Sequence, residues 1–422
     1  MANNISLKAV LMQFHGICAL ICLSRVLDLC LTKNAFLCSM QTNENYMRLK
    51  MQNDVVSYFL RLVAIDSESL NERGMIDILK ADLQDLGAEI EEDDCHTKTG
   101  GNAGNLFARL PGSIQKDPIL LCAHVDTVKP GNGVKARIEG DRIVTDGTTI
   151  LGSDDKSGIA EIMIALKRIV ESGVEHAPIE ILFTVSEEIG LLGAKGFDKS
   201  RLKSAFGYAF DTHVVGELVT GAPSQNSWEA VIHGRESHAG VAPEKGLNAI
   251  RIAAEAISAM PMGRIDDETT CNLGKIQGGE ATNIVPNKAC LYGEVRSHDH
   301  SKLEQVSDQI RKVLEETIAR YSEDGARLEF SCNDEYKAFN VKEDAPVVSW
   351  AKTSLRNLDI PYTIGRGGGG SDANVISASG IPMIIVGTGM DNVHTVKECI
   401  RIEELHRGAD FVTELIRLYS QA

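Results

Sequence analysis

The feature that most restricts the fold of this chain is a long helical pattern between two short apolar runs. Residues 118–126, PILLCAHVD, and residues 179–188, IEILFTVSEE, each read as a buried strand. Residues 155–173 lie between them and space apolar side chains three and four apart, as one face of a helix requires. This alternation predicts an α/β fold with helices on both faces of a largely parallel sheet.

The same alternation extends along most of the chain. Residues 54–65 and 74–88 read as amphipathic helices, and residues 105–110 read as a further buried strand. Near the end of the chain, a helix, a glycine-rich turn, a strand and a closing helix follow one another. We therefore expect a doubly wound catalytic domain that is built from two segments, 47–223 and 336–422.

A different pattern separates these two segments. Residues 224–335 read in the order strand, helix, strand, strand, helix, strand. This βαββαβ order describes a ferredoxin-like α+β unit, so we expect an inserted domain. A chain of 422 residues is long enough for two such cores.

The leader, residues 1–46, fits neither domain. A basic residue precedes its apolar stretch, as in a signal peptide, but Gln13 and His15 interrupt the stretch and no A-x-A-like cleavage site follows. The stretch is also too broken for a membrane span. We expect a disordered extension or an upstream mis-start, with export or organelle targeting as the alternative.

The six cysteines after the leader show no CxxC spacing, which favours a reducing cytoplasm.

The charge balance limits the partners of the protein. With 43 basic and 59 acidic residues, the chain has a formal net charge of -16. Such a charge disfavours nucleic acid and anionic membranes as partners. Bound cations could neutralise part of the acidic excess, although an acidic surface can also serve solubility alone.

Acidic and imidazole side chains cluster where the expected strands end. His124 and Asp126 share one face of a strand end, and a carboxylate behind an imidazole fixes its tautomer in metal sites, although a lone buried histidine is usually structural. Asp154 and Asp155 precede a helix, where they could be ligands or an N-cap. Ligands of open α/β sheets bind beyond the carboxyl ends of the strands, so these side chains are expected to converge.

Glu187 and Glu188 stand side by side at the end of a buried strand, where their charges repel each other. A divalent cation removes this repulsion, because one carboxylate can bind the ion while its neighbour takes a proton from water; the alternative is a pair of solvated loop residues. Asp211 and His394 follow two further strands. Two histidines with several carboxylates and no thiolate suit zinc, cobalt or manganese, and two ions could share one carboxylate.

Taken together, these motifs resemble a known family. HVDTV, GSDDKSG, SEEIGLLGA, the aspartate after YAF and the distal His394 are similar to the dizinc exopeptidase family of peptidase T, carboxypeptidase G, aminoacylase and succinyl-diaminopimelate desuccinylase. The resemblance runs from about residue 51 to the end. DTHVVGELVTGAPSQN, SHAGVAPEKGLNAI and ETTCNLGKIQGGEATNIVPNKA look most like the peptidase T-like branch.

The resemblance implies a role for each member of the constellation. Glu187 would be the general base, Asp126 would orient His124, and the Asp154-Asp155 peptide bond would be cis. Two zinc ions per subunit would be bound by two ligand pairs and one bridging residue: His124 and Asp211, Glu188 and His394, and the bridge Asp154.

The resemblance also concerns the substrate and the oligomer. His238 is similar to the family histidine that reaches the partner subunit's active site and polarises the scissile carbonyl, which would make a homodimer through the inserted domain functional. The alternative for His238 is a surface histidine in a loop. Asn283 and Arg296 could bind the substrate backbone and carboxylate, and a structural ion pair is an equal rival for Arg296.

A glycine-rich loop, GRGGGGSDAN, admits two interpretations. Gly365, Gly367 and Gly370 satisfy G-x-G-x-x-G, and Asp391 lies about the distance onward that a dinucleotide site requires. However, the loop is late in the chain and the helix after it is short. We favour backbone N–H groups, including those of Gly369 and Gly370, that bind a substrate carboxylate.

The sequence therefore predicts a cytoplasmic, homodimeric, zinc-dependent metallopeptidase of the tripeptide aminopeptidase type. One alternative keeps the chemistry and changes the substrate, as in a carboxypeptidase or an N-acyl amino acid amidohydrolase. The others are a binding or scaffold protein that retains the fold without turnover, and a nucleotide-dependent oxidoreductase.

Overall fold

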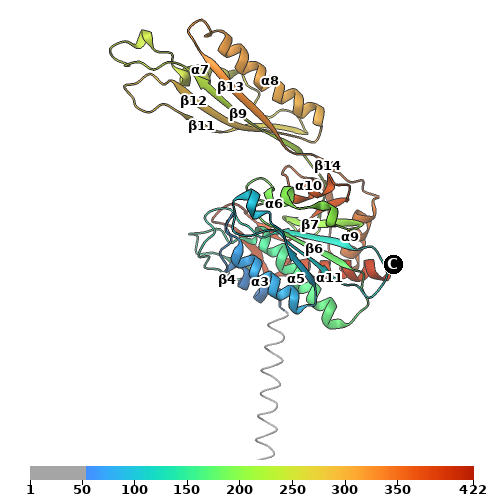
Figure 1. Ribbon diagram of the computed structural model, residues 1–422. Helices are drawn as coiled ribbons and strands as arrows, with labels where there is room; N and C mark the ends of the chain where they lie inside the picture. Colours follow the sequence, from blue (N-terminus) through green and yellow to red (C-terminus); the bar gives the residue numbers. More distant parts are fainter. Residues whose placement is uncertain (1–53) are drawn as a thin grey trace, which may run out of the picture.

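The computed structural model describes residues 54–422, so the expectations for the leader lie outside the described residues. Figure 1 shows a layered α/β body with a slender second unit standing on one side of it. The chain enters this unit through β9 and leaves it through β13, and these two strands lie side by side at the junction with the body.

A mixed sheet of nine strands forms the centre of the larger body. Its four middle strands run parallel, in the order β6 (Ile179–Thr184), β3 (Ile119–His124), β7 (Phe206–Thr212) and β16 (Met383–Gly387). The flanking strands are β1 (Glu89–Glu92) and β2 (Leu106–Leu110) on one side, and β8 (Glu217–Ala222), β14 (Phe339–Asn340) and β15 (Thr363–Arg366) on the other. The pairs β1–β2, β2–β6, β16–β8 and β8–β14 are antiparallel, whereas β15 pairs parallel with β8. The prediction of a largely parallel central sheet in an α/β fold is confirmed.

The central strands are buried on both faces, which explains their nearly continuous apolar sequences. In β3, Ile119 and Leu121 belong to one hydrophobic core, whereas Leu120 and Cys122 belong to another. The first core includes five helices: α2 (Val55–Val63), α3 (Arg73–Asp85), α5 (Ser153–Ser172), α9 (Pro346–Asn357) and α11 (Ile402–Gln421). The second core includes residues of α10 (Asp372–Ser377) and the segment after α6 (Leu192–Gly196).

The sequence patterns did not predict several short elements. They are the helix α4 (His96–Thr99) and a small four-stranded sheet of β4 (Arg137–Glu139), β5 (Arg142–Val144), β17 (Met390–Asp391) and β18 (Cys399–Arg401). Strands of two or three residues are too short to display a period of two, so only their long-range pairing identifies them.

The second unit is an antiparallel sheet of five strands with two helices packed on one face. The strands are, in spatial order, β10 (Gly263–Arg264), β11 (Thr269–Gly278), β12 (Lys288–Ser297), β9 (Ser224–His233) and β13 (Arg327–Tyr336). The helices α7 (Ala249–Ala259) and α8 (His300–Ala319) share one hydrophobic core with this sheet. The four long strands follow the ferredoxin-like order, and we propose residues 224–335 as an inserted domain.

Two further features of the described residues bear on the sequence predictions. No helix among residues 54–422 has the length and apolarity that crossing a membrane requires. The cysteines of this part of the chain are all free thiols: Cys95, Cys122, Cys271, Cys290, Cys332 and Cys399.

One acidic side chain is buried in the main core without a partner. Glu161 on α5 is fully buried against Gly408 of α11, and neither carboxylate oxygen has a hydrogen-bond partner among the described residues. Burial raises the pKa of Glu161 well above its ordinary value. The folded protein therefore holds this carboxyl protonated at pH values where the unfolded chain ionises it, so stability falls as the pH rises above about 4.5.

We expect Glu161→Met to increase the free energy of unfolding at pH 8 by about 1–3 kcal/mol, because it removes an unpaired polar group at similar length. The gain should be smaller at pH 5, where ionisation costs less. Urea denaturation of both proteins at the two pH values measures the difference. Glu161→Gln is the matched control, because it removes the pH dependence and leaves a polar group buried. An equal gain at both pH values for Glu161→Met would contradict the assignment to ionisation.

Candidate active site

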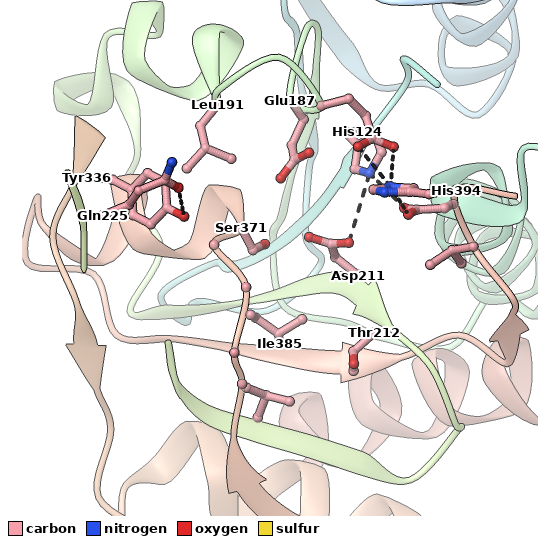
Figure 2. Close-up of a pocket in the computed structure, with 18 of the residues that line it drawn as sticks. His124, Glu187, Leu191, Asp211, Thr212, Gln225, Tyr336, Ser371, Ile385 and His394 are labelled. Carbon is pink, nitrogen blue, oxygen red and sulfur yellow. Dashed lines mark hydrogen bonds and ion pairs between the residues drawn. The ribbon is translucent and has the colours of Figure 1, made fainter. Parts of the chain in front are cut away.

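The parallel strands open at their carboxyl ends into one cavity of about 780 Å³ (Figure 2). Because these ends meet at one edge of the sheet, they bring together side chains that are far apart in the sequence. The cavity wall includes the five sequence-predicted metal ligands and the expected base: His124, Asp154, Glu187, Glu188, Asp211 and His394. Residues of the inserted unit, among them Gln225 and Tyr336, complete the opposite wall.

Asp154 lies at the centre of two groups of potential ligand atoms. Its Oδ1 is 3.0 Å from His124 Nε2, which lies 3.9 Å from Asp211 Oδ1. Its Oδ2 is 3.2 Å from His394 Nε2, which lies 3.0 Å from Glu188 Oε2. Within each group of three, the ligand atoms lie within 4.8 Å of one another. The two groups have the same members as the two expected ligand sets, with Asp154 common to both.

At the start of α5, the side chains of Asp154 and Asp155 point in different directions. The backbone at both residues is not helical, and the peptide bond between them is cis, as the resemblance implies. Asp155 turns inward, where its carboxylate accepts hydrogen bonds from the backbone N–H groups of Gly158 and His124. The N-cap of α5 is Gly152, so neither aspartate is the cap: Asp155 binds backbone N–H groups, whereas Asp154 faces the cavity.

Two buried carboxylates hold the turn that carries the glutamate pair. Asp126 accepts hydrogen bonds from the backbone N–H of Glu187 at 2.9 Å and of Glu188 at 3.2 Å. Glu72 accepts two from Ser186, from its N–H at 3.1 Å and its hydroxyl at 2.9 Å. The two carboxylates thus replace the solvent that an exposed turn would use.

Asp126 also contacts the imidazole of His124, through two groups. Its carboxylate Oδ1 is 3.5 Å from Nδ1, and its backbone carbonyl is closer, at 3.0 Å. The backbone carbonyl is the better hydrogen-bond acceptor by distance. Both contacts direct Nε2 of His124 toward Asp154 and the cavity.

The electrostatics of the cluster are those of a cation site. Burial raises the pKa of Asp211 to about 8. Burial alone would lower the pKa of His124, but the carboxylates of Asp126 and Asp154 outweigh it and raise that pKa well above its usual value. Hydrogen bonds to Asp154 and Glu188 raise the pKa of His394 to about 10. The carboxylates thus draw protons onto both imidazoles, and nitrogen and oxygen donors of this kind fit zinc or a related divalent ion.

Glu187 lies beside this cluster but belongs to neither ligand group. Its side chain is 8% exposed and points into the cavity from the turn after β6 (Figure 2). Burial raises the pKa of this carboxyl well above its ordinary value. A carboxyl of raised pKa next to potential metal ligands is suited to accept a proton and to release it again.

His238 and Asn283 do not line the cavity. They lie next to each other, because the backbone N–H of Ala239 donates to the carbonyl of Asn283, and both are exposed. β9 leads from the cavity wall toward them, and its ten residues span roughly 30 Å at about 3.3 Å per residue. Figure 1 shows this strand pointing away from the larger body. Within one chain the two residues are therefore too far away to contact a substrate at the metal ligands.

Arg296 does line the cavity, and it forms the ion pair that was its alternative role. Its Nε is 3.0 Å and its Nη2 is 3.1 Å from the two carboxylate oxygens of Glu294. Gln225 donates to the same carboxylate at 3.1 Å, and the Tyr336 hydroxyl donates to Gln225 at 2.6 Å. This network borders the glycine loop, because a side chain at Gly370 would meet the Tyr336 ring at 2.2 Å.

The glycine loop faces the same cavity as the metal ligands. Gly367, Gly368, Gly369 and Gly370 all belong to its wall. Asp391, the acidic residue of the dinucleotide alternative, pairs instead with the small sheet in β17 and lies 3.7 Å from Arg142. The loop is therefore placed to contact whatever binds beside the cluster.

The sequence analysis missed several residues of the cavity. Gln225, Glu294 and Tyr336 come from the strands of the inserted unit, and Ser371 precedes α10. Polar residues in strands carry no local signal of function, because alternation on an exposed sheet face produces the same pattern. The glycine run before Ser371 was the one available signal.

Comparison with known proteins identifies the relatives of this site and fold. Residues 221–322 match a family described as the peptidase dimerisation domain, and residues 105–234 match peptidase family M28. A crystal structure of aminopeptidase PepT from Bacillus cereus ATCC 10987 is 42% identical, with a TM-score of 0.78, over 86% of this chain and 98% of that one. The chain belongs to the M20 peptidase family.

Two further relatives extend the similarity. A tripeptidase from Staphylococcus aureus Mu50 is 38% identical, with a TM-score of 0.83, over 88% of this M20 chain and 99% of its own. The uncharacterized protein YqjE of Bacillus subtilis is 43% identical over 85% of this chain and 96% of its own. The resemblance to the peptidase T-like branch is thereby confirmed. The protein is a metallopeptidase that hydrolyses peptides, which excludes the scaffold and oxidoreductase alternatives.

Proposed function

We propose that this protein is a two-zinc tripeptide aminopeptidase in which Glu187 is the general base. The observation that supports it most is the pair of three-residue ligand groups that share Asp154, with Glu187 beside them. Two divalent cations at these groups would activate a water molecule and polarise the peptide carbonyl. His124, Asp154 and Asp211 would bind one ion, and Asp154, Glu188 and His394 the other.

The residues of the chain then divide the work of hydrolysis. Glu187 takes the proton of the attacking water and passes it to the leaving amine, for which its burial and raised pKa are suited. Asp126 keeps His124 and the Glu187 turn in place through the contacts described above.

The charges of the opposite wall favour a short peptide with free termini. Arg296 and Glu294 form an ion pair on the cavity wall, so the inserted unit presents both signs of charge to the cavity. Glu335 also lines the cavity and pairs at 2.9 Å with Lys195 of α6, which lies outside the inserted unit. A zwitterionic tripeptide carries an ammonium group and a carboxylate, and can exchange partners with both pairs. The volume of about 780 Å³ lies in the usual range of small-molecule sites, about 300–1,000 Å³.

We further propose that the enzyme acts as a homodimer, in which His238 of one subunit completes the active site of the other. The match of residues 221–322 to a peptidase dimerisation domain supports this arrangement. So does the distance of roughly 30 Å along β9, which removes His238 from the cavity of its own chain. At the partner's site, a histidine N–H can stabilise the oxyanion that forms on the peptide carbonyl.

The alternative activities, carboxypeptidase and N-acyl amino acid amidohydrolase, differ in the substrate terminus that must be free. We expect the purified protein to bind about two zinc ions per subunit and to cleave free tripeptides. N-acetylated tripeptides should be poor substrates, and C-terminally amidated ones should be affected less. Preference for the acetylated series would support the amidohydrolase. Strict dependence on the free carboxylate with tolerance of acetylation would support the carboxypeptidase.

Metal binding should release protons from the protein. At pH 7.5 the raised pKa values of His124 and His394, the latter about 10, keep both imidazoles charged in the metal-free protein. Zinc binds only neutral imidazole and ionised carboxylate, and burial raises the pKa of Asp211 to about 8, so this carboxyl is also partly protonated. We therefore expect release of about two to three protons per subunit and an affinity that falls as the pH falls. Calorimetry in buffers of different ionisation enthalpy measures the release. His394→Ala should reduce it, and heats that do not depend on the buffer would contradict the prediction.

A further inference from the structure

Glu398 is a buried acidic residue that the proposed mechanism does not use. It is 1% exposed and lies four residues after His394. Its carboxylate reaches the turn before α5, where it accepts four hydrogen bonds. Oε2 accepts from the N–H groups of Leu151 and Gly152, both at 2.8 Å. Oε1 accepts from the Ser153 hydroxyl at 2.6 Å and from the N–H of Asp154 at 3.0 Å.

These four contacts join the two segments that carry ligands of one proposed ion. The turn at residues 151–154 ends in Asp154, whereas the turn before Glu398 contains His394 and closes through the N–H of Glu398, which donates to the carbonyl of Thr395 at 3.0 Å. About 240 residues separate the turns in sequence. Other direct contacts between them run through the ligand side chains themselves, such as His394 Nε2 and Asp154 Oδ2 at 3.2 Å.

The turn before α5 depends on an outside acceptor. Gly152 caps the helix with a left-handed φ of 76° and offers no side-chain hydrogen bond, so the first N–H groups have no local partner. In a buried position, an N–H without an acceptor costs about 1–3 kcal/mol. The carboxylate of Glu398 satisfies three such N–H groups and one hydroxyl at the same time.

We propose that Glu398 is a positioning residue that fixes the position of Asp154 relative to His394. It thereby sets the affinity for the ion that Asp154, Glu188 and His394 would bind. This inference rests on the proposed two-metal function. Glu398 itself contacts neither the cavity nor the ligand atoms, because it does not line the cavity and its partners are the backbone and Ser153. It acts through the orientation of the two ligands.

Glutamine cannot replace this carboxylate, although it has the same shape. Oε2 faces two backbone N–H donors, and Oε1 faces one backbone N–H and the Ser153 hydroxyl, so either orientation of an amide would place its NH₂ group against at least one backbone N–H. The turn must then move, and Asp154 moves with it. Glu398→Gln is therefore a test of geometry at nearly constant volume.

Glu180, in β6 of the central sheet, provides a matched control. It is 1% exposed and also accepts four hydrogen bonds, from Arg109 Nε, the N–H groups of Lys203 and Ser204, and the Ser204 hydroxyl. The loop that it holds carries none of the proposed ligands. Glu180→Gln should reproduce the loss of a buried acceptor without disturbing a metal ligand.

The test is a titration of zinc, and of cobalt as a spectroscopic probe, into the chelator-treated full-length protein. For Glu398→Gln we expect the ion of the Asp154, Glu188 and His394 group to bind about 10–100-fold more weakly, while the other ion binds normally. The absorption spectrum of the bound cobalt should also change. Excess zinc should restore most of kcat with KM little changed. Glu180→Gln should bind both ions normally even where its thermal midpoint is lower.

Three results would overturn the inference: unchanged affinity in Glu398→Gln, equal loss of metal in Glu180→Gln, or a loss of kcat that excess zinc does not restore. A wild-type protein that binds no zinc would instead reject the proposed function itself. If Glu398→Gln does not fold, Ser153→Ala removes only one donor-acceptor contact. The Ser153→Ala variant should then bind one of the two ions several-fold more weakly. Unchanged binding in that variant would also overturn the inference.

Discussion

Glu187→Gln is expected to lower kcat by about 10²–10⁴-fold while both zinc ions remain bound. Glutamine keeps the length and the backbone contacts of residue 187, so the hydrogen bond from its N–H to Asp126 persists. The variant lacks only the carboxylate that accepts the proton from water. Because Glu187 belongs to neither ligand group, its loss should not change the metal content.

The measurement combines tripeptide hydrolysis with metal analysis on the same protein preparation. Glu188→Gln is the matched control, since the adjacent residue belongs to a ligand group and should lose affinity for one ion. Excess zinc should leave Glu187→Gln inactive. If Glu187→Gln lost zinc as Glu188→Gln does, Glu187 would be a ligand and the assignment of the base would be wrong.

His238→Ala is expected to lower kcat by about 10²–10³-fold, although His238 lies far from the cavity of its own chain. Activity should return when the subunits of this variant and of Glu187→Gln are dissociated, mixed and allowed to reassociate. A mixed dimer has one intact site, made of Glu187 from one subunit and His238 from the other.

Random reassociation makes about half of the dimers mixed, each with one intact site of two, so recovery should reach about one quarter of the wild-type activity. His233→Ala is the matched control, because this histidine lies at the end of β9 and pairs with Glu329 on the surface of the same unit. It should retain full activity. If the mixture stays inactive, His238 does not act at the partner subunit's site: it acts within its own chain or has no role in catalysis.

The sequence predicted those parts of the site that depend on regular local structure. A period of two placed His124 at the end of β3, and buried apolar runs placed Glu188 and Asp211 at the ends of their strands. Parallel strands separated by helices bring such ends to one edge, so a list of strand ends is also a list of neighbours in space. The order βαββαβ of the inserted unit was readable for the same reason.

Other parts depend on contacts between distant residues and have no local pattern. Asp155, and not Asp154, accepts a hydrogen bond from the backbone of α5, and this difference follows from the direction of the two side chains in the folded turn. Glu72 and Glu398 hold the ligand turns from other segments, through hydrogen bonds across more than a hundred residues. An isolated glutamate in the sequence is usually a solvated side chain, so neither residue attracts notice there.

By itself, then, the sequence determined which residue types stand at the carboxyl ends of the strands, and hence the class of chemistry. The tertiary structure decided which oxygen of Asp154 faces which histidine, which buried carboxylates support the ligand turns, and that β9 takes His238 away from its own cavity. The physical reason is that periodicity encodes the face on which a side chain lies, whereas distances between segments are set by how the whole core packs.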